Sequence, residues 1–260
     1  MSIVSRDAKA PTILVAWRGK SLIDEATIRV VVHCLKEGSK SRKTGKMVQV
    51  LICNDDVYPH DAVKTGADFS VCGNCPLRPT NGGGCYCNLG KHYPRVWETS
   101  NELVADLEAA CVAIRASGLP VRIGSWGDPS AVPFDVISTL VNAARGDDGR
   151  ARHTAYTNAW ATCDQRLREV AMASVLSEAE KVMAERAGWA TLRVRTADMP
   201  VLQGEVVCPA SKEAGHRTTC SNCLMCCGTG RGKGTHVVIQ THGSANKVNR
   251  LHRLIEEPES

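Results

Sequence analysis

Clustered cysteines are the residues of this chain whose type and spacing most clearly indicate chemistry. The chain has 13 cysteines in 260 residues, and most of them gather in two short segments. A chain of this length can bury a sufficient core without disulfides, so grouped cysteines are better explained as metal ligands. The predicted metal ligands, four from each segment, are Cys72, Cys75, Cys85, Cys87, Cys208, Cys220, Cys223 and Cys226.

The first segment spaces its cysteines as C-x2-C-x9-C-x-C, from Cys72 to Cys87. A C-x2-C pair places two sulfurs about one metal-ligand span apart on a tight turn. The glycines at 82–84 let the backbone fold back, so that Cys85 can close the site. Cys87 is either a fourth ligand or points away, and zinc and an iron–sulfur cluster fit this segment about equally well.

The second segment has a C-x2-C-x2-C core, from Cys220 to Cys226, preceded at a distance by Cys208 and Pro209. Tetrahedral zinc is usually bound by two separated cysteine pairs, whereas three cysteines at this spacing wrap one iron–sulfur cubane. A Cys-Pro supplies the remaining ligand in bacterial ferredoxins, although the order is reversed here. This segment therefore predicts a [4Fe–4S] cluster, with zinc as the alternative. The cysteines outside both segments are interpreted as small core residues: Cys34, Cys53, Cys111 and Cys163.

Polar residues at the ends of predicted strands are the candidates for catalysis and for binding. In parallel sheets and barrels, chemistry takes place where the strands end. The candidate catalytic residues are Asp128 and Arg195, and the candidate cofactor-binding residues are Asn158, Ser174 and His242. Asp128 has a structural alternative, because Asp-Pro commonly starts a turn or caps a helix.

The elements that must position these residues predict an α/β fold. Alternating strands and helices imply a mostly parallel sheet or a partial (β/α) barrel, with cysteine-rich metal-binding loops. Residues 1–55 are expected to form a β-rich N-terminal segment that packs on the main domain, residues 56–260. The predicted strands cover residues 12–17, 28–33, 47–53, 121–126, 153–157, 170–174, 191–195, 205–208 and 236–241, and the predicted helices cover 61–65, 96–116, 133–144, 177–187 and 245–255.

Composition limits the partners and the compartment that we expect. The net charge of +5 permits contact with nucleic acid, for which the basic loop at residues 36–46 and the basic C-terminal stretch are the candidates. No apolar run approaches the ~18 residues of a membrane span, and the start lacks the pattern of a signal peptide. The sequence therefore predicts a cytoplasmic protein without a membrane partner.

Several blocks of the chain resemble an uncharacterised family of proteins encoded by bacteriophages and prophages, which implies a host-cytoplasm location. Relatives often lack a cysteine at position 87, so the resemblance implies three ligands at the first site. They also carry Tyr in place of Trp126 and His in place of Asn158, so no family role is carried over to these two residues. The resembling blocks are KTGKMVQ (43–49), AVKTGADFSVCGNCPLR (62–78), RIGSWGDPSAVP (122–133), VAMAS (170–174), TLRVR (191–195) and CPASKEAGHRTTCSNC (208–223).

The strand order, the Gly-Asp-Pro loop and the closing Gln-x-His-Gly are remotely similar to phage proteins classed with the radical S-adenosylmethionine (SAM) enzymes. The usual C-x3-C-x2-C signature of those enzymes is absent. The similarity implies that the first site, with three cysteine ligands, has an open iron for SAM or substrate. It also implies that the second site is a closed auxiliary or electron-transfer cluster.

The sequence thus predicts an iron–sulfur enzyme, radical-SAM-like or redox, that acts on a small nucleotide or nucleic-acid-related substrate. The main alternative is a nucleic-acid-binding module with two structural zinc sites. A further alternative is a phage structural protein in which metal only staples loops.

Overall fold

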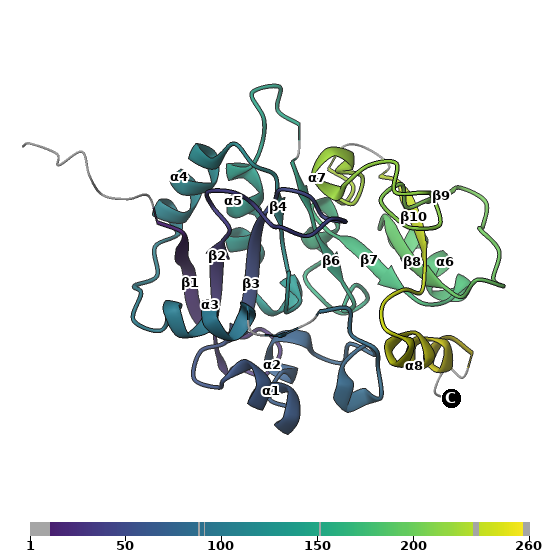
Figure 1. Cartoon of the computed structure of the whole chain (residues 1–260), viewed down its shortest axis with the longest axis horizontal. Helices are drawn as coiled ribbons and strands as arrows, with labels where there is room; N and C mark the ends of the chain where they lie inside the picture. Colours follow the sequence, from purple (N-terminus) through teal and green to yellow (C-terminus); the bar gives the residue numbers. More distant parts are fainter. Residues whose placement is uncertain (1–10, 88, 91, 151, 231–233, 257–260) are drawn as a thin grey trace, which may run out of the picture.

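The computed structural model describes residues 11–87, 89–90, 92–150, 152–230 and 234–256, which form an α/β fold (Figure 1). Within these residues, ten strands make two five-stranded sheets, one mixed and one wholly parallel. The predicted α/β class is confirmed. No helix in the described part of the chain is long and apolar enough to cross a membrane.

The mixed sheet combines an antiparallel and a parallel part. Strand β1 (Ile13–Lys20) pairs antiparallel with β2 (Thr27–His33), which pairs antiparallel with β3 (Val48–Asn54). Strand β4 (Val121–Arg122) then follows β3 in parallel, and β5 (His153–Thr154) follows β4. The strands of residues 1–55 therefore share a sheet with strands from later in the chain, and a division at residue 55 stays a prediction.

The parallel sheet continues almost directly from the mixed one. Its strands, in spatial order, are β6 (Tyr156–Thr157), β7 (Met172–Val175), β8 (Thr191–Arg195), β10 (His236–Gln240) and β9 (Glu205–Val207). Only Ala155 separates β5 from β6. Its carbonyl oxygen accepts from Met172 N at 3.0 Å, while its own N–H donates to Cys226 O at 3.1 Å. The chain therefore changes sheets at Ala155, where a backbone hydrogen bond donated to the second cysteine segment takes the place of a strand partner.

Eight helices are described, and they differ from the predicted set mainly between residues 92 and 117. They are α1 (Pro59–Thr65), α2 (Phe69–Cys72), α3 (His92–Ser100), α4 (Leu107–Ser117), α5 (Phe134–Ala143), α6 (Glu178–Arg186), α7 (Cys220–Cys223) and α8 (Ala245–Glu256). The single helix predicted over residues 96–116 is wrong. The chain leaves the helix after Ser100, and Asp106 starts α4 by accepting from Ala109 N at 2.8 Å. The Asp106 N–H also donates to Val15 O at 2.9 Å, so contact with β1 outweighs a continuous helical pattern.

The strand predicted over residues 121–126 is shortened to β4 for a conformational reason. Gly124 and Gly127 adopt positive φ angles of 66° and 80°, which end the extended conformation. Pairing with β3 nevertheless continues, because Ser125 N donates to Val50 O at 2.8 Å and Ile52 N donates to Trp126 O at 2.9 Å. The result is a tight loop held against the carboxyl half of β3.

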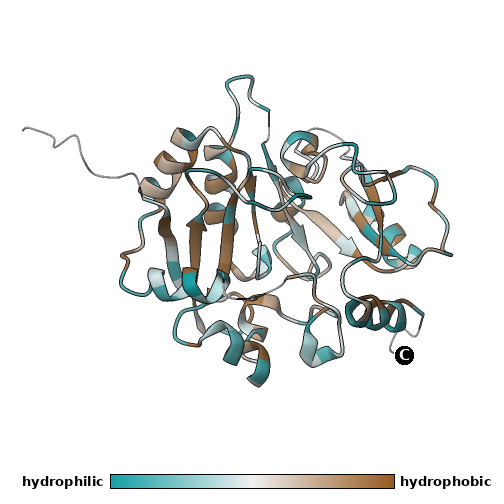
Figure 2. Cartoon of the chain, in the orientation of Figure 1, coloured by the Kyte–Doolittle hydropathy of each residue, from teal (hydrophilic) through white to brown (hydrophobic). Residues whose placement is uncertain are grey.

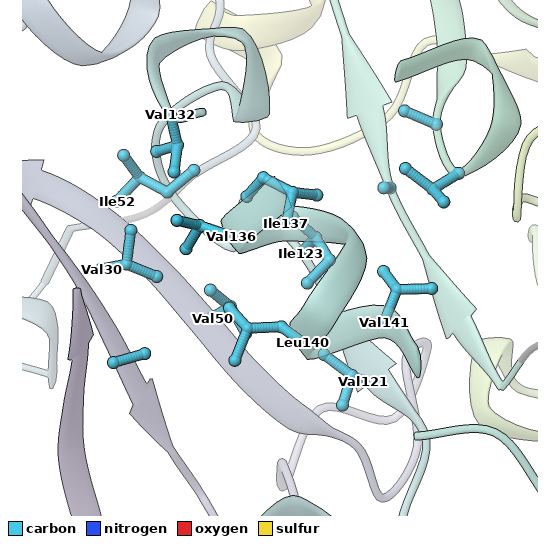
Figure 3. Packing of buried hydrophobic residues seen from close by; sticks show 14 of the residues in the cluster. Val30, Val50, Ile52, Val121, Ile123, Val132, Val136, Ile137, Leu140 and Val141 are labelled. Carbon is cyan, nitrogen blue, oxygen red and sulfur yellow. The ribbon is translucent and has the colours of Figure 1, made fainter. Parts of the chain in front are cut away.

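The main core lies between α5 and the mixed sheet. Figure 3 shows Ile137 and Leu140 of α5 against Val50 of β3 and Val121 of β4, and all four side chains are fully buried. Burying each such aliphatic side chain contributes about 1.5–3 kcal/mol. In Figure 2, β2 and β3 are brown with apolar residues, whereas α8 is mostly teal with hydrophilic ones. This difference agrees with burial, since Leu251 is the buried residue of α8. This core holds the mixed sheet, and the first cysteine segment follows its strand β3 along the chain.

Candidate metal centres

The four cysteines of the first segment line one cavity of about 340 Å³. Cys72 ends α2, and Cys75, Cys85 and Cys87 lie in the loop that follows. This loop comes after the carboxyl end of β3, and α8 comes after the carboxyl end of β10, on the same side of the sheets in Figure 1. The first segment therefore lies on the side where these parallel strands end.

Buried charge holds the first cysteine loop in shape. Arg78 binds both carboxylate oxygens of Asp68, at 3.1 Å and 2.5 Å, and also donates to the carbonyl oxygens of Gly66 and Gly73. Both side chains are almost wholly buried. Gly84 lets the loop approach α8, since a Cβ there would lie 2.5 Å from Lys247 O. The cavity is thus built by long-range contacts and not by the cysteine spacing alone.

Hydrogen bonding separates Cys87 from the other three thiols. Cys87 Sγ donates to Ser125 O at 3.1 Å, and Tyr93 Oη donates to the same oxygen at 3.0 Å. A hydrogen bond with Cys87 lowers the pKa of Cys85 to about 7, while the same hydrogen bond and burial raise the pKa of Cys87 well above its ordinary value. Within this pair, Cys87 therefore keeps its proton, and Cys85 more readily becomes a thiolate.

Burial and mutual proximity shape the other two thiols of the first cavity. The pKa of Cys72 is raised well above its ordinary value by burial and then by the neighbouring Cys75 and Cys85. Burial raises the pKa of Cys75 to about 12. Neighbouring thiolates repel one another in a low-dielectric site even without direct contact, and a bound cation would offset that repulsion.

The four cysteines of the second segment line a smaller cavity of about 60 Å³. Leu192, Val237 and Ile239 of the parallel sheet form apolar walls, and Lys43 and Tyr156 add polar groups. Helix α7, which carries Cys220 and Cys223, lies toward the opposite end of the strands from α8 in Figure 1. The second cavity is thus smaller than the first, and strands of the parallel sheet form part of its wall.

The basic loop at residues 36–46 packs on the second cysteine segment. Cys220 N donates to Lys43 O at 3.0 Å, and Ser221 N donates to Thr44 O at 2.8 Å. Burial lowers the pKa of Lys43, although neighbouring thiols, Cys208 and Cys220 foremost, oppose this effect. The loop at residues 36–46 is the candidate for contact with nucleic acid. One of its lysines, Lys43, instead lines the second cavity.

Arg122 has neighbours in both cysteine groups, and Tyr156 lies beside the second. Burial alone would lower the pKa of Arg122, but Cys87 of the first group and Cys220 of the second are among the neighbours that raise it. The pKa of Tyr156 is raised well above its ordinary value by burial and by the thiols Cys226 and Cys220. Arg122 therefore has thiols of both groups as neighbours, and the Tyr156 phenol lies near it on the side of the second group.

His242 contacts Tyr86 of the first cysteine segment and Lys43, which lines the second cavity. Its ring stacks on Tyr86, between Cys85 and Cys87 in sequence, with 4.5 Å between ring centroids. Its Nε2 lies 2.9 Å from Nζ of Lys43. Of the candidate cofactor-binding residues, His242 is thus placed against residues that belong to both centres.

Asp128 and Asn158 are brought together beside the first cavity. Asp128 is buried and accepts from Ser130 N at 2.9 Å and from Asn158 N at 2.8 Å, and burial raises its pKa. Asn158 and Cys75 both line a third cavity of about 530 Å³, so this space adjoins the first. Asp128 caps a 3-10 turn, which is the structural role that an Asp-Pro pair commonly has. Its side chain also positions the loop that contains Asn158.

Arg195 and Ser174 lie outside the lining of both cysteine cavities. The buried Arg195 forms an ion pair with Glu213 and donates to the carbonyl oxygens of Thr196 and Met199. Ser174 is half-buried within β7. These contacts give Arg195 a role in holding the segment that leads to the second cysteine group.

Lys43 and Arg122 are the site residues that sequence reasoning missed as neighbours of the cysteines. Neither follows a metal-binding spacing, and only the packing of distant segments brings them to the thiols. Comparison of the chain with protein-family models, curated proteins and solved structures finds no match.

Proposed function

We propose that the chain is an iron–sulfur enzyme that binds a [4Fe–4S] cluster in each cysteine cavity. The first cluster acts on a small nucleotide-related substrate by redox or SAM-dependent chemistry. Iron–sulfur clusters supply single electrons, and an iron without a protein ligand can also bind a substrate group.

The observation that carries this proposal is the separation of the sulfurs. Four cysteines line each cavity, yet within the described residues no three cysteines bring their sulfurs within 4.8 Å of one another. Tetrahedral zinc with Zn–S bonds of about 2.3 Å needs sulfurs about 3.8 Å apart. A cubane binds one thiolate at each iron, so its ligands stand farther apart, and this separation favours clusters over single zinc ions.

The proposed ligands of the first cluster are Cys72, Cys75 and Cys85. The Cys87 thiol is engaged with Ser125 O and with Cys85, which supports three ligands and one open iron. Lys247 and Arg250 of α8 line the same cavity and supply positive charge. A small molecule bound there would carry an anionic group, such as the carboxylate of SAM or a substrate phosphate.

The second cluster is proposed to be closed, with Cys208, Cys220, Cys223 and Cys226 as its ligands. Its walls are apolar, and Lys43 offsets the negative charge of the thiolates. Arg122, which has neighbours in both groups, adds positive charge that offsets thiolates of both centres.

The third cavity is the proposed substrate site. Its volume of about 530 Å³ is that of a small-molecule pocket, and it adjoins the first cavity at Cys75. Asn158 and Asp164 supply polar groups, and Phe69 supplies an aromatic ring. Asp128 acts here as a positioning residue, since it holds the backbone of Asn158.

Anaerobic purification with iron and sulfide analysis tests the proposal. We expect a brown protein with two clusters, and each of Cys75→Ala and Cys223→Ala should lose one cluster while keeping the other. Cys111→Ala is the matched control, because Cys111 is a buried cysteine of α4 outside both cavities. A colourless protein that holds zinc in place of iron would overturn the proposal and support the nucleic-acid-binding alternative.

The ligand count at the first centre has its own test. Cys87→Ala should keep both clusters, whereas Cys72→Ala should lose the first. Addition of SAM to dithionite-reduced protein should change the electron paramagnetic resonance signal of the first cluster, and it should leave the spectrum of Cys75→Ala unchanged. If SAM changes no signal in the intact protein, the SAM-dependent form of the proposal fails and the redox form remains.

A further inference from the structure

Three metal-binding side chains meet outside both cysteine cavities. Donor atoms of His33, Cys34 and His92 all lie within 4.8 Å of one another, and no other such group of three occurs in the described part of the chain. His33 Nδ1 lies 3.3 Å from Cys34 Sγ, and the two imidazole rings are 5.1 Å apart between centroids. The cysteine that the sequence indicated as a core residue is thus beside two histidines.

The backbone at Cys34 holds this group together at a conformational cost. Cys34 has a φ of 63°, in the left-handed region, which costs about 1–2 kcal/mol for a residue with a side chain. It follows the last residue of β2 directly, and its carbonyl oxygen accepts from Gly38 N at 3.0 Å. The strained turn places the thiol beside the imidazole of the preceding residue, where two successive residues of a strand would point apart.

The His33 imidazole is buried with an unused nitrogen. Its residue is 2% exposed, and Nε2 has no hydrogen-bond partner among the described residues. An unsatisfied buried polar atom costs about 1–3 kcal/mol. His92, by contrast, is exposed at the first turn of α3, so the group has an opening to solvent.

We propose that His33, Cys34 and His92 bind one Zn²⁺ ion, with a fourth position open to solvent. Two imidazoles and a thiolate suit zinc, and hard cations such as Mg²⁺ are disfavoured because the group offers no oxygen ligand. On binding, the Cys34 thiol releases one proton to solvent, and its sulfur and the imidazole nitrogens each donate an electron pair to the metal. No change of oxidation state is involved.

The position of this site gives it a consequence for the first cysteine cavity. The ring of Tyr93, next to His92, lies edge-on to His33 at 6.3 Å, and its hydroxyl shares Ser125 O with Cys87. A metal ion here would tie the start of α3 to the end of β2. It would thereby hold the aromatic residue that packs behind Cys87.

Cobalt titration of the full-length, anaerobically purified protein tests this site, with Co²⁺ as the probe for zinc. We expect His92→Ala to bind one equivalent of Co²⁺ fewer than the intact protein, and Cys34→Ser to lose the thiolate-to-cobalt charge-transfer band of this site. His60→Ala is the control, since His60 is a histidine of α1 outside the group.

The outcomes separate this site from the cysteine centres. Iron content measured on the same samples should be equal in the intact protein, His92→Ala and His60→Ala. If His92→Ala binds as much Co²⁺ as the intact protein, the zinc site is overturned, whatever the iron content shows. If the protein lacks iron but still loses one equivalent in His92→Ala, the zinc site stands and the iron–sulfur proposal fails.

Discussion

At the scale of single residues, Gly127 beside the first cavity has strict conformational and steric requirements. It follows Trp126, which lines that cavity, and it adopts a φ of 80°. A Cβ at this position would lie 2.4 Å from Ile52 O and 2.7 Å from Ile52 Cβ. Both the conformation and the close approach to β3 therefore require glycine.

Replacing Gly127 with alanine should destabilise the protein strongly. The left-handed conformation costs a residue with a Cβ about 1–2 kcal/mol, and the contact with a backbone oxygen adds to that cost. Gly118→Ala is the matched control, because Gly118 has a φ of 62° and no atom lies within 4 Å of the point that its Cβ would occupy. Thermal unfolding should show a clearly larger loss of stability for Gly127→Ala; equal losses would mean that the contact with Ile52 relaxes freely.

The residues of the candidate sites differ in how far sequence could reveal them. The cysteines carry their signal in local spacing, and the structure gathers each group around one cavity. Lys43, by contrast, reaches Cys220 from another part of the chain, and His92 reaches Cys34 from the start of another element. No local sequence pattern predicts these contacts, because they depend on how the sheets and loops pack.

At the scale of elements, a buried ion pair attaches the edge strand β9 to the parallel sheet. Arg193 of β8 donates to both carboxylate oxygens of Glu205, each at 2.7 Å, and these side chains are 1% and 0% exposed. Leu202 N donates to the same carboxylate at 2.8 Å. Burial alone would raise the pKa of Glu205, but the hydrogen bonds from Arg193 lower it below its ordinary value.

Arg193→Met should destabilise the protein by about 3–5 kcal/mol, because it leaves the Glu205 carboxylate buried and unpaired. The double variant Arg193→Met, Glu205→Leu should recover much of this loss. Urea unfolding at neutral pH measures both, with Arg150→Met as the control, since Arg150 pairs with Asp148 at an exposed site. A double variant as unstable as the single one would contradict the assignment of the loss to an unpaired charge.

The same pair predicts a dependence on pH. Since the folded-state pKa of Glu205 is lowered, its contribution is complete above the unfolded value of about 4.3 and is lost as the pH falls through the folded value. The difference in stability between the intact protein and the double variant should therefore shrink on acidification below about pH 4. Urea unfolding across this pH range measures the difference, and a constant difference would contradict the lowered pKa.

The elements show where local sequence information is sufficient. Strand β8 begins and ends at the predicted residues, and α6 lies within the predicted range 177–187, where Ser177 and Glu180 form a capping box at its start. The break between α3 and α4 is not predicted because the helical pattern continues across it, while the deciding hydrogen bond runs from the Asp106 N–H to the carbonyl oxygen of Val15 in β1. Local propensity decides an element until a tertiary contact competes with it.

At the scale of the whole molecule, cysteines from both groups pack in one region. Cys75 and Cys85 of the first group and Cys208 and Cys226 of the second all pack in the cluster that includes Met172. Bound metal at either centre would therefore stabilise the same part of the core.

Removing the metal with a chelator under anaerobic conditions should lower the midpoint of thermal unfolding. A ligand held at a thousand times its dissociation constant contributes about 4 kcal/mol, which for a chain of this size corresponds to roughly 8–16 °C. Calorimetry of stripped and reconstituted protein measures the shift. Identical midpoints would show that the metal binds without stabilising the folded state.

The hydrogen bonds from Cys220 and Ser221 to the loop of Lys43 and Thr44 bear on the order in which the protein matures during synthesis. The ligands of the first centre leave the ribosome within one short stretch of chain. The second centre needs the loop of Lys43 and Thr44 to be in place for cysteines that are made much later in the chain. Translation thus sets a sequence of assembly in which the first cysteine segment is available to metal donors well before the second, and both centres can close only after the second segment has been made.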